Sequence, residues 1–366
     1  MKKTVKEGKT MKKKWKSLLA FMFIVLVLGL AACSQSSSGS SNEGAAEGGK
    51  GNSDEKLTVV WYPNESGNDL KSARDEIGKI IEEATGRSVE HKLTTDYAIA
   101  IETIVNGNAH LAFMGAQGYI EANNKNDKVQ PLAVPSGPSG TLDDAQYYSW
   151  LAVNKEDAQS YMKDGKYDIA NIEGKKFSFV STSSTSGFKV PSAGIVSYFS
   201  EQDKYKDLVA EDLLEGGGLF SEVMFGDSHQ GSAVNLLNNR AEVAAFCDTC
   251  VDNYVEVAEG EASRPGTIYK VKEDAAEPFN TVTGKEFTLI SVTPVLNAPF
   301  VANTEVLSEE EMKAIQEIFT SQEVADNENI FVPEDADISG LFKKTDKEQF
   351  VAAEDSWFDP IRELSK

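Results

Sequence analysis

The sequence predicts an α/β protein of two lobes, each a mostly parallel sheet covered by helices. Two observations lead to this fold class. From Glu55 onward, strand-like segments alternate with segments of helical spacing, which is the order of a helix-covered parallel sheet. The chain beyond Glu55 is also long enough for two domains, and a Pro/Gly-rich run at 131–140 separates two such series.

The first residues predict export. Residues 1–16 contain eight lysines and one glutamate, and an apolar run follows at 18–30. This order is typical of a secretory signal, and the run is too short for a permanent membrane span. Leu30-Ala-Ala-Cys33 resembles the lipobox of bacterial lipoproteins. The resemblance implies a signal peptide at 1–32 and a lipid on Cys33 that anchors the chain to the extracytoplasmic face of the cell membrane.

The next segment, residues 33–54, is mostly Ser, Gly, Glu, Asn and Ala, so we expect a flexible tether. The formal charge of the whole chain is −22, and loss of the eight lysines and one glutamate before Cys33 would take it to −29. Such acidity excludes nucleic acid as a partner and disfavours an anionic bilayer surface. Any bound anion must be held by local dipoles and hydrogen bonds.

Lobe 1 is expected to comprise residues 55–146 and 295–366. Its first elements alternate between strand and helix patterns before the chain crosses to the other lobe. After the return, helices are predicted at 308–320, where Ser308 and Glu311 form a capping box, and near 347–353. The first five elements are strands at 57–62, 88–93 and 110–114 and helices at 70–84 and 97–105.

Lobe 2 is expected to comprise residues 147–294. The segments at 145–151 and 291–298 connect the lobes, and we expect them to act as hinges. Because ligands bind at the carboxyl ends of strands in open α/β sheets, the cleft between the lobes is the expected pocket. The predicted elements are strands at 147–153, 177–180, 222–225, 242–246 and 287–294 and helices at 193–199 and 233–239.

A loop of hydroxyl residues is the main candidate site. Every residue from Ser181 to Ser186 is Ser or Thr, and Gly187 follows. The loop lies between a predicted strand and a predicted helix, so its hydroxyls and free N–H groups meet the positive end of the helix dipole. An ordinary helix cap needs only one hydroxyl. The pattern therefore favours a pocket for a small oxyanion, with a simple cap as the alternative.

Two cysteines form the run Cys247-Asp-Thr-Cys250. A local disulfide is expected first in an exported protein, then two free thiols, then a redox or metal site. No second Cys-x-x-Cys or His pair accompanies them, so no metal site and no cofactor are expected.

Several stretches resemble the phosphonate/phosphite (PhnD-like) solute-binding proteins of ABC transporters. The most specific is Ser-Thr-Ser-Gly at 184–187 with Val190-Pro191 after it. The resemblance covers most of residues 57–303 and implies a periplasmic-binding-protein-like fold of type II and delivery of a ligand to a membrane permease. The stretches are 95–97, 114–119, 147–155, 183–191, 228–234 and 242–248.

The resemblance also implies ligand-binding residues. The hydroxyl loop would donate to the ligand oxygens, Tyr97 and Tyr147 would face the ligand, and His229 would donate from the start of a helix. Asp248 would accept a proton from a P–OH group, which sulfate lacks. The alternatives are core aromatics, a helix-flanking histidine and an exposed aspartate. The full set is Tyr97, Gln117, Tyr147, Ser183, Ser184, Thr185, Ser186, His229 and Asp248.

One departure bears on the ligand. In aminophosphonate binders of this family an acidic residue follows the Pro of the later crossing strand, whereas here Asn297-Ala298 follow Pro294-Val-Leu. The sequence therefore favours phosphite, phosphate or a small alkylphosphonate.

The resemblance implies a monomeric transport receptor, and two other functions are alternatives. An extracellular phosphatase or hydrolase would use Ser184, His229 and Asp248 as nucleophile, base and orienting group. However, the serine lies in a row of equivalent hydroxyls and not at a G-x-S-x-G elbow. An adhesion or sensor lipoprotein would leave the hydroxyl loop unexplained.

Overall fold

The computed structural model describes residues 55–336 and 338–364. The predicted signal peptide, lipobox and tether lie outside these residues. Within them, every helix is too short or too polar to cross a bilayer.

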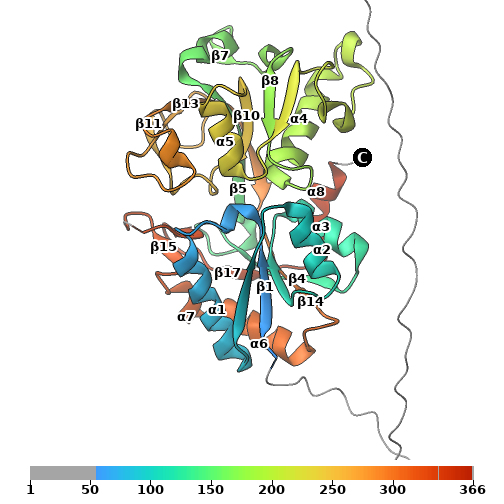
Figure 1. Ribbon diagram of the computed structural model, residues 1–366, viewed down its shortest axis with the longest axis vertical. Helices are drawn as coiled ribbons and strands as arrows, with labels where there is room; N and C mark the ends of the chain where they lie inside the picture. Colours follow the sequence, from blue (N-terminus) through green and yellow to red (C-terminus); the bar gives the residue numbers. More distant parts are fainter. Residues whose placement is uncertain (1–54, 337, 365–366) are drawn as a thin grey trace, which may run out of the picture. The chain divides into compact units, whose positions relative to one another are not determined.

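The first sheet, which defines lobe 1, has six strands in the order β17-β4-β14-β3-β1-β2 (Figure 1). The three strands at one end of the sheet pair in parallel, β1 with β2 and with β3, and the other pairs are antiparallel. The strands are β1 (Leu57–Trp61), β2 (Val89–Leu93), β3 (Leu111–Phe113), β4 (Val129–Pro135), β14 (Phe300–Asn303) and β17 (Phe350–Ala352).

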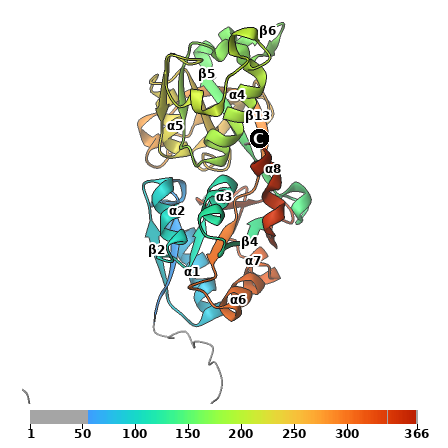
Figure 2. The ribbon, with the colours of Figure 1, turned by 90° about the vertical axis from the view of Figure 1, so that its right-hand side faces the viewer.

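Helices cover both faces of this sheet. Val60 and Ala112 pack on the side of α2 (Tyr97–Val105), α3 (Ala116–Lys125) and α8 (Asp359–Glu363). Their neighbours in the strands, such as Trp61, pack on the side of α1 (Lys71–Thr85), α6 (Glu309–Phe319) and α7 (Gln322–Ala325). Because side chains alternate along a strand, burial on both faces explains the nearly continuous apolar sequence of β1. The C-terminal α8 lies beside α3 (Figure 2).

The second sheet, which defines lobe 2, has seven strands in the order β11-β12-β13-β5-β10-β8-β9. Only β8 with β9 and β8 with β10 pair in parallel. The strands are β5 (Gln146–Asn154), β8 (Lys176–Phe179), β9 (Glu222–Phe225), β10 (Val243–Cys247), β11 (Val255–Glu259), β12 (Ile268–Val271) and β13 (Glu286–Leu296).

Two helical segments lead the chain over the two faces of this sheet. On one face, α4 (Val190–Phe199) packs against Phe177 and Phe179, and a π-helical turn, η5 (Thr185–Lys189), precedes it. On the other face, α5 (His229–Leu237) packs against Ala244 and Phe246. Two small ribbons complete the fold: β6 (Met162–Lys163) with β7 (Lys166–Tyr167), and β15 (Phe331–Pro333) with β16 (Phe342–Lys344).

The chain passes between the lobes after β4 and again after β13. The two long strands β5 and β13 pair antiparallel from Gln146–Leu296 to Asn154–Phe287. Each therefore runs from the neighbourhood of lobe 1 into the second sheet, and together they join the lobes (Figure 1).

Two expectations from the sequence are wrong. Both sheets are mixed and not mostly parallel, because the connecting strands and the C-terminal strand enter antiparallel to their neighbours. Residues 350–352 form a strand and not a helix: Phe350, Val351 and Ala352 pair with β4. Pairing at a sheet edge outweighed the weak helical spacing of this short segment.

Candidate functional site

A cavity of about 250 Å³ is lined by residues of both lobes. Lobe 1 contributes the end of β1 and the starts of α2 and α3, and lobe 2 contributes the hydroxyl loop and the start of α5. The lining residues that matter most are Tyr62, Asn64, Glu65, Tyr97 and Gly115 from lobe 1 and Tyr147, Ser184, Thr185, His229 and Gln230 from lobe 2.

Four helical segments begin at this cavity. Tyr97 is the first residue of α2 and His229 the first of α5. Gly115 caps α3, and Ser184 caps η5, which runs on into α4. Each helix N-terminus carries partial positive charge, although side chains already accept from some of the first N–H groups, as Asp96 does in α2 and Ser228 in α5. The arrangement can therefore hold an anion without a positively charged side chain.

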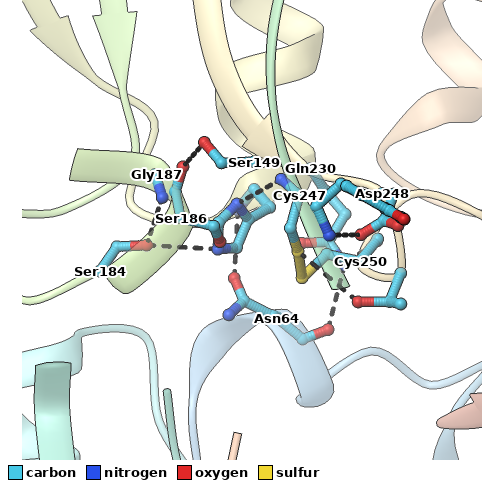
Figure 3. The surroundings of a disulfide bond; sticks show 12 residues. Asn64, Ser149, Ser184, Ser186, Gly187, Gln230, Cys247, Asp248 and Cys250 are labelled. Carbon is cyan, nitrogen blue, oxygen red and sulfur yellow. Dashed lines mark hydrogen bonds between the residues drawn. A yellow bond between two sulfur atoms is a disulfide. The ribbon is translucent and has the colours of Figure 1, made fainter. Parts of the chain in front are cut away.

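The hydroxyl loop is held in place by main-chain contacts. Ser184 Oγ accepts a hydrogen bond from the Gly187 N–H at 3.1 Å, and Ser149 Oγ donates to the Ser186 carbonyl at 2.6 Å (Figure 3). The π-helical turn that follows is a form often found at functional sites. Ser186 Oγ is buried without a hydrogen-bond partner among the described residues. The loop is thus more elaborate than a single helix cap.

His229 is a neutral donor because of its surroundings. Its Nδ1 accepts the Cys247 backbone N–H at 3.0 Å, so the proton of the neutral ring lies on Nε2, which is 3.3 Å from Ser184 Oγ. Burial lowers the pKa of His229 to about 3, since a charged ring would lose its hydration. A neutral Nε2–H group can donate to an oxyanion.

The same geometry argues against the hydrolase. A catalytic base needs a free nitrogen facing the serine, and here that nitrogen carries the proton. The other nitrogen faces a backbone N–H, where a triad would have the carboxylate. Asp248 instead accepts the Tyr148 N–H at 2.9 Å.

Asn64 connects the two lobes across the cavity (Figure 3). Its Nδ2 donates to Tyr97 OH at 2.7 Å, and its Oδ1 accepts the His229 N–H at 3.1 Å. Gln230 Nε2 donates to the Asn64 carbonyl at 3.1 Å. One loop of lobe 1 therefore positions Tyr97 and the start of α5 together.

A second connection joins α3 to the hydroxyl loop. Thr185 Oγ1 accepts the Gln117 N–H at 2.9 Å, and Ser183 Oγ donates to Glu121 at 2.7 Å. Gly115 permits this approach, since a Cβ at its position would lie 2.7 Å from Thr185 Oγ1.

The lining also contains a buried acid, Glu65. Its Oε2 has no hydrogen-bond partner among the described residues. Burial raises its pKa to about 8, against the lowering effects of Asn64 and Arg74, so the carboxyl is mostly neutral at pH 7. Lys343 is the one Lys or Arg among the described lining residues.

Of the nine residues predicted to bind ligand, five line the cavity: Tyr97, Tyr147, Ser184, Thr185 and His229. Gln117, Ser183 and Ser186 lie next to it through the contacts above and do not line it. Asp248 is half-buried at the end of β10, outside the lining, and burial raises its pKa to about 7.

Sequence reasoning missed Tyr62, Asn64, Glu65 and Gln230. The first three follow β1 directly, where Pro63-Asn64 predicted only a turn. A signal was present, because residues after the carboxyl end of a strand in an α/β sheet are placed to meet ligands. Gln230 follows His229, which was predicted to bind.

The structure forms a disulfide between Cys247 and Cys250. The two residues flank the site: Cys247 holds the His229 ring through its N–H, and the Cys250 carbonyl accepts from Gln230 Nε2 at 3.0 Å. Cys250 also lines the cavity, and Figure 3 shows the disulfide with the residues around it.

The sequence matches a family model described as "ABC transporter, phosphonate, periplasmic substrate-binding protein" over residues 59–358. The chain belongs to this family. A relative from Mycolicibacterium smegmatis, the "Phosphate-import protein PhnD", is 30% identical over 262 residues, 70% of this chain and 74% of that protein. The family consists of transport binding proteins and not enzymes.

Solved structures share the fold. A binding-protein component of an ABC phosphonate transporter from Pseudomonas aeruginosa is 19% identical, with a TM-score of 0.59 over 85% of both chains. PhnD1 from Prochlorococcus marinus, solved with methylphosphonate, is 16% identical, with a TM-score of 0.57 over 84% of this chain and 96% of its own. This phosphonate-family chain therefore has the two-lobed fold of periplasmic binding proteins, and it is the substrate-binding component of an ABC phosphonate/phosphate transporter.

Proposed function

We propose that this protein is a lipid-anchored receptor that binds a small phosphorus oxyanion, namely phosphonate, phosphite or phosphate, in the cavity between its lobes and delivers it to a membrane permease. The convergence of four helix N-termini on one cavity carries this proposal. A tetrahedral oxyanion has enough oxygens to accept from several of them at once.

Neutral donors would hold the ligand. Ser184 and Thr185 offer hydroxyls at the start of η5, and the Nε2–H of His229 is already set as a donor by the Cys247 N–H. Tyr97 and Tyr147 supply further hydroxyls; burial raises the pKa of each phenol, so both stay protonated. Hydrogen bonds to a charged acceptor are each worth about 1.5–3 kcal/mol.

Phosphorus oxyanions are favoured over other anions by the relatives. One curated relative is a phosphate-import protein, and a protein of the same fold was solved with methylphosphonate. The acidic charge of the whole chain would repel anions at long range, so short-range donors must account for the affinity.

Export and anchoring complete the proposal. The basic and apolar residues before Cys33 would direct export, Cys33 would carry the lipid, and residues 33–54 would tether the globule to the membrane. We expect a monomer that docks on its permease and changes lobe spacing at the strands joining the lobes.

Titration calorimetry tests ligand binding. The chain from residue 52 onward is titrated with phosphite, methylphosphonate, 2-aminoethylphosphonate, phosphate and sulfate. Saturable heat with at least one phosphorus compound is expected. Absence of binding to all four phosphorus compounds would overturn the proposal, whereas sulfate measures selectivity. Metabolic labelling of the full chain with a fatty acid, compared with a Cys33→Ala variant, tests the lipid anchor separately.

A further inference from the structure

The acid in the cavity poses a problem of charge. An anion bound beside the starts of α2, η5 and α5 would share the cavity with Glu65. Two negative charges in one buried site repel strongly unless a proton or a cation separates them. The nearest guanidinium, that of Arg74, donates to the main-chain carbonyls of Glu65 and Gly67 and not to the Glu65 carboxyl group. A proton on Glu65 is therefore the simplest way to avoid the repulsion.

The hydrogen bonding of Glu65 is incomplete. The residue is 9% exposed, and its Oε2 is buried without a partner among the described residues. Buried polar atoms are nearly always hydrogen-bonded, and an orphan atom calls for an explanation. A ligand oxygen in the cavity would supply the missing partner.

A second lining acid shows that a missing hydrogen-bond partner is not a general property of the acids in the cavity wall. Glu348 is also buried, but its carboxylate accepts from the backbone N–H groups of Thr345 and Asp346 and from the Thr345 hydroxyl. These bonds lower its pKa. Glu348 is therefore a satisfied carboxylate, and Glu65 is not.

We propose that Glu65 is a further ligand-binding residue that meets the oxyanion as a neutral acid, donating a hydrogen bond from its carboxyl group to a ligand oxygen. The inference rests on the proposed function. The carboxyl keeps its proton in the complex, and no bond other than this hydrogen bond forms. A fully deprotonated oxyanion is the form that fits, because it offers an acceptor to every donor of the cavity.

The acid that meets the ligand is thus Glu65 and not Asp248. The sequence led us to expect Asp248 to share a proton with the ligand, but Asp248 lies outside the lining and bonds to the main chain of β5. Glu65 lines the cavity instead, and its pKa of about 8 favours the neutral carboxyl at pH 7. The titratable groups around it are Arg74, Tyr62, Tyr97, Tyr147, Tyr254 and His229, with Asp252, Lys343 and Glu348 elsewhere on the wall.

The pH dependence of affinity tests the proposal. The Kd for methylphosphonate is measured by calorimetry between pH 6 and pH 9 for the wild type, Glu65→Gln and Glu348→Gln. The ligand titrates equally in all three proteins, so ratios of Kd isolate the substituted residue. The amide of Glu65→Gln remains a donor but cannot ionise.

The ratio of wild-type Kd to Glu65→Gln Kd is expected to rise about tenfold from pH 7 to pH 9, since a carboxyl with a pKa near 8 loses its proton there. The ratio to Glu348→Gln should stay constant. A ratio to Glu65→Gln that does not change with pH, while both proteins bind, overturns this inference and leaves the proposed function intact. If no phosphorus ligand binds any of the proteins, the proposed function fails, and this inference with it.

A second measurement uses the wild type alone. At pH 9, heats of binding in two buffers of different ionisation enthalpy give the number of protons taken up. About one proton per ligand is expected, because Glu65 must regain its proton to bind. Uptake of none would overturn the proposal even if Glu65→Gln does not fold.

Discussion

The two walls of the cavity differ in how their polar groups are partnered. On the lobe 2 wall, Ser184 and His229 each have a role set by a main-chain contact within lobe 2, to Gly187 and Cys247 respectively. On the lobe 1 wall, Tyr62 OH and Glu65 Oε2 are buried without partners among the described residues. The donors Ser184 and His229 are thus organised before any ligand arrives, whereas Tyr62 and Glu65 have bonds that a ligand could complete; Gln230 Oε1 is the lining atom of lobe 2 that also lacks a partner among the described residues. Preorganised donors lower the cost of binding, and titratable groups link binding to pH.

The largest expected effect is the loss of ligand affinity when hydroxyl donors of the lobe 2 wall are removed. The double variant Ser184→Ala/Thr185→Ala removes two hydroxyl donors, so the affinity for the best phosphorus ligand should fall by about 3 kcal/mol or more, at least 100-fold. Calorimetry measures the loss. Thr182→Ala is the matched control, because this hydroxyl belongs to the same loop but is exposed. Unchanged affinity in the double variant would show that the loop is only a helix cap.

On the lobe 1 wall, Glu65 should make the free energy of unfolding depend on pH. The pKa of Glu65 is raised from 4.5 to about 8, so the folded state keeps a proton that the unfolded chain releases. The contribution of Glu65 to stability is therefore expected to fall as the pH rises from about 4.5 to 8, by about 3 kcal/mol at pH 7. Urea unfolding of the ligand-free protein at pH 5 and pH 8 measures this. In Glu65→Gln that part of the pH dependence should disappear; its persistence would contradict the neutral acid.

His229 should show the opposite trend. Its pKa is lowered from 6.5 to about 3, so the unfolded chain takes up a proton that the folded state excludes. The stability that depends on the neutral ring is complete above pH 6.5 and lost as the pH falls toward 3, about 2 kcal/mol by pH 5. Urea unfolding at pH 5 and pH 7 should show this rise as the difference between the wild type and His229→Gln, because the other titrating groups, Glu65 included, are common to both proteins. The variant should also bind its ligand at least tenfold more weakly; equal slopes in both proteins would show that the ring is not buried in its neutral form.

Reduction of the Cys247–Cys250 disulfide tests how far the lobe 2 wall depends on this bond. A bond closing so short a loop contributes about 2 kcal/mol by the loop-entropy estimate. We expect reduction to lower the free energy of unfolding by at most this amount and to weaken ligand binding by less, because Cys247 and Cys250 contact His229 and Gln230 through main-chain atoms. Unfolding and titration with and without a phosphine reductant measure both. The Cys247→Ser/Cys250→Ser variant should be insensitive to the reductant.

The smallest effect is expected at Asp248. Because it lies outside the cavity lining and bonds to Tyr148 N–H, Asp248→Asn should change the Kd less than threefold at pH 7. Calorimetry against the same ligand tests this. A loss of 10-fold or more would restore the role that the sequence predicted for this residue.

Local patterns predicted much of the fold and one wall of the site. The strand at 57–62 and the helix at 97–105 appear as β1 and α2, since an apolar run and helical spacing are properties of a short segment. The mixed direction of the sheets was not predictable in this way. Strand direction depends on which distant segments pair, as when β17 joins β4 from the far end of the chain.

The sequence by itself determined the α/β class and the hydroxyl loop, because each depends on neighbouring residues; export and lipid anchoring stay predictions. Only the tertiary structure decided which acid meets the cavity. Asp248 and Glu65 both follow a strand, but the β5 main chain engages Asp248, whereas burial beside Tyr97 and α5 leaves Glu65 with an open oxygen. The burial and the hydrogen-bond partners of a carboxyl group are set by contacts between segments far apart in the chain. The protonation state of the group therefore depends on the tertiary structure and cannot be read from the sequence around it.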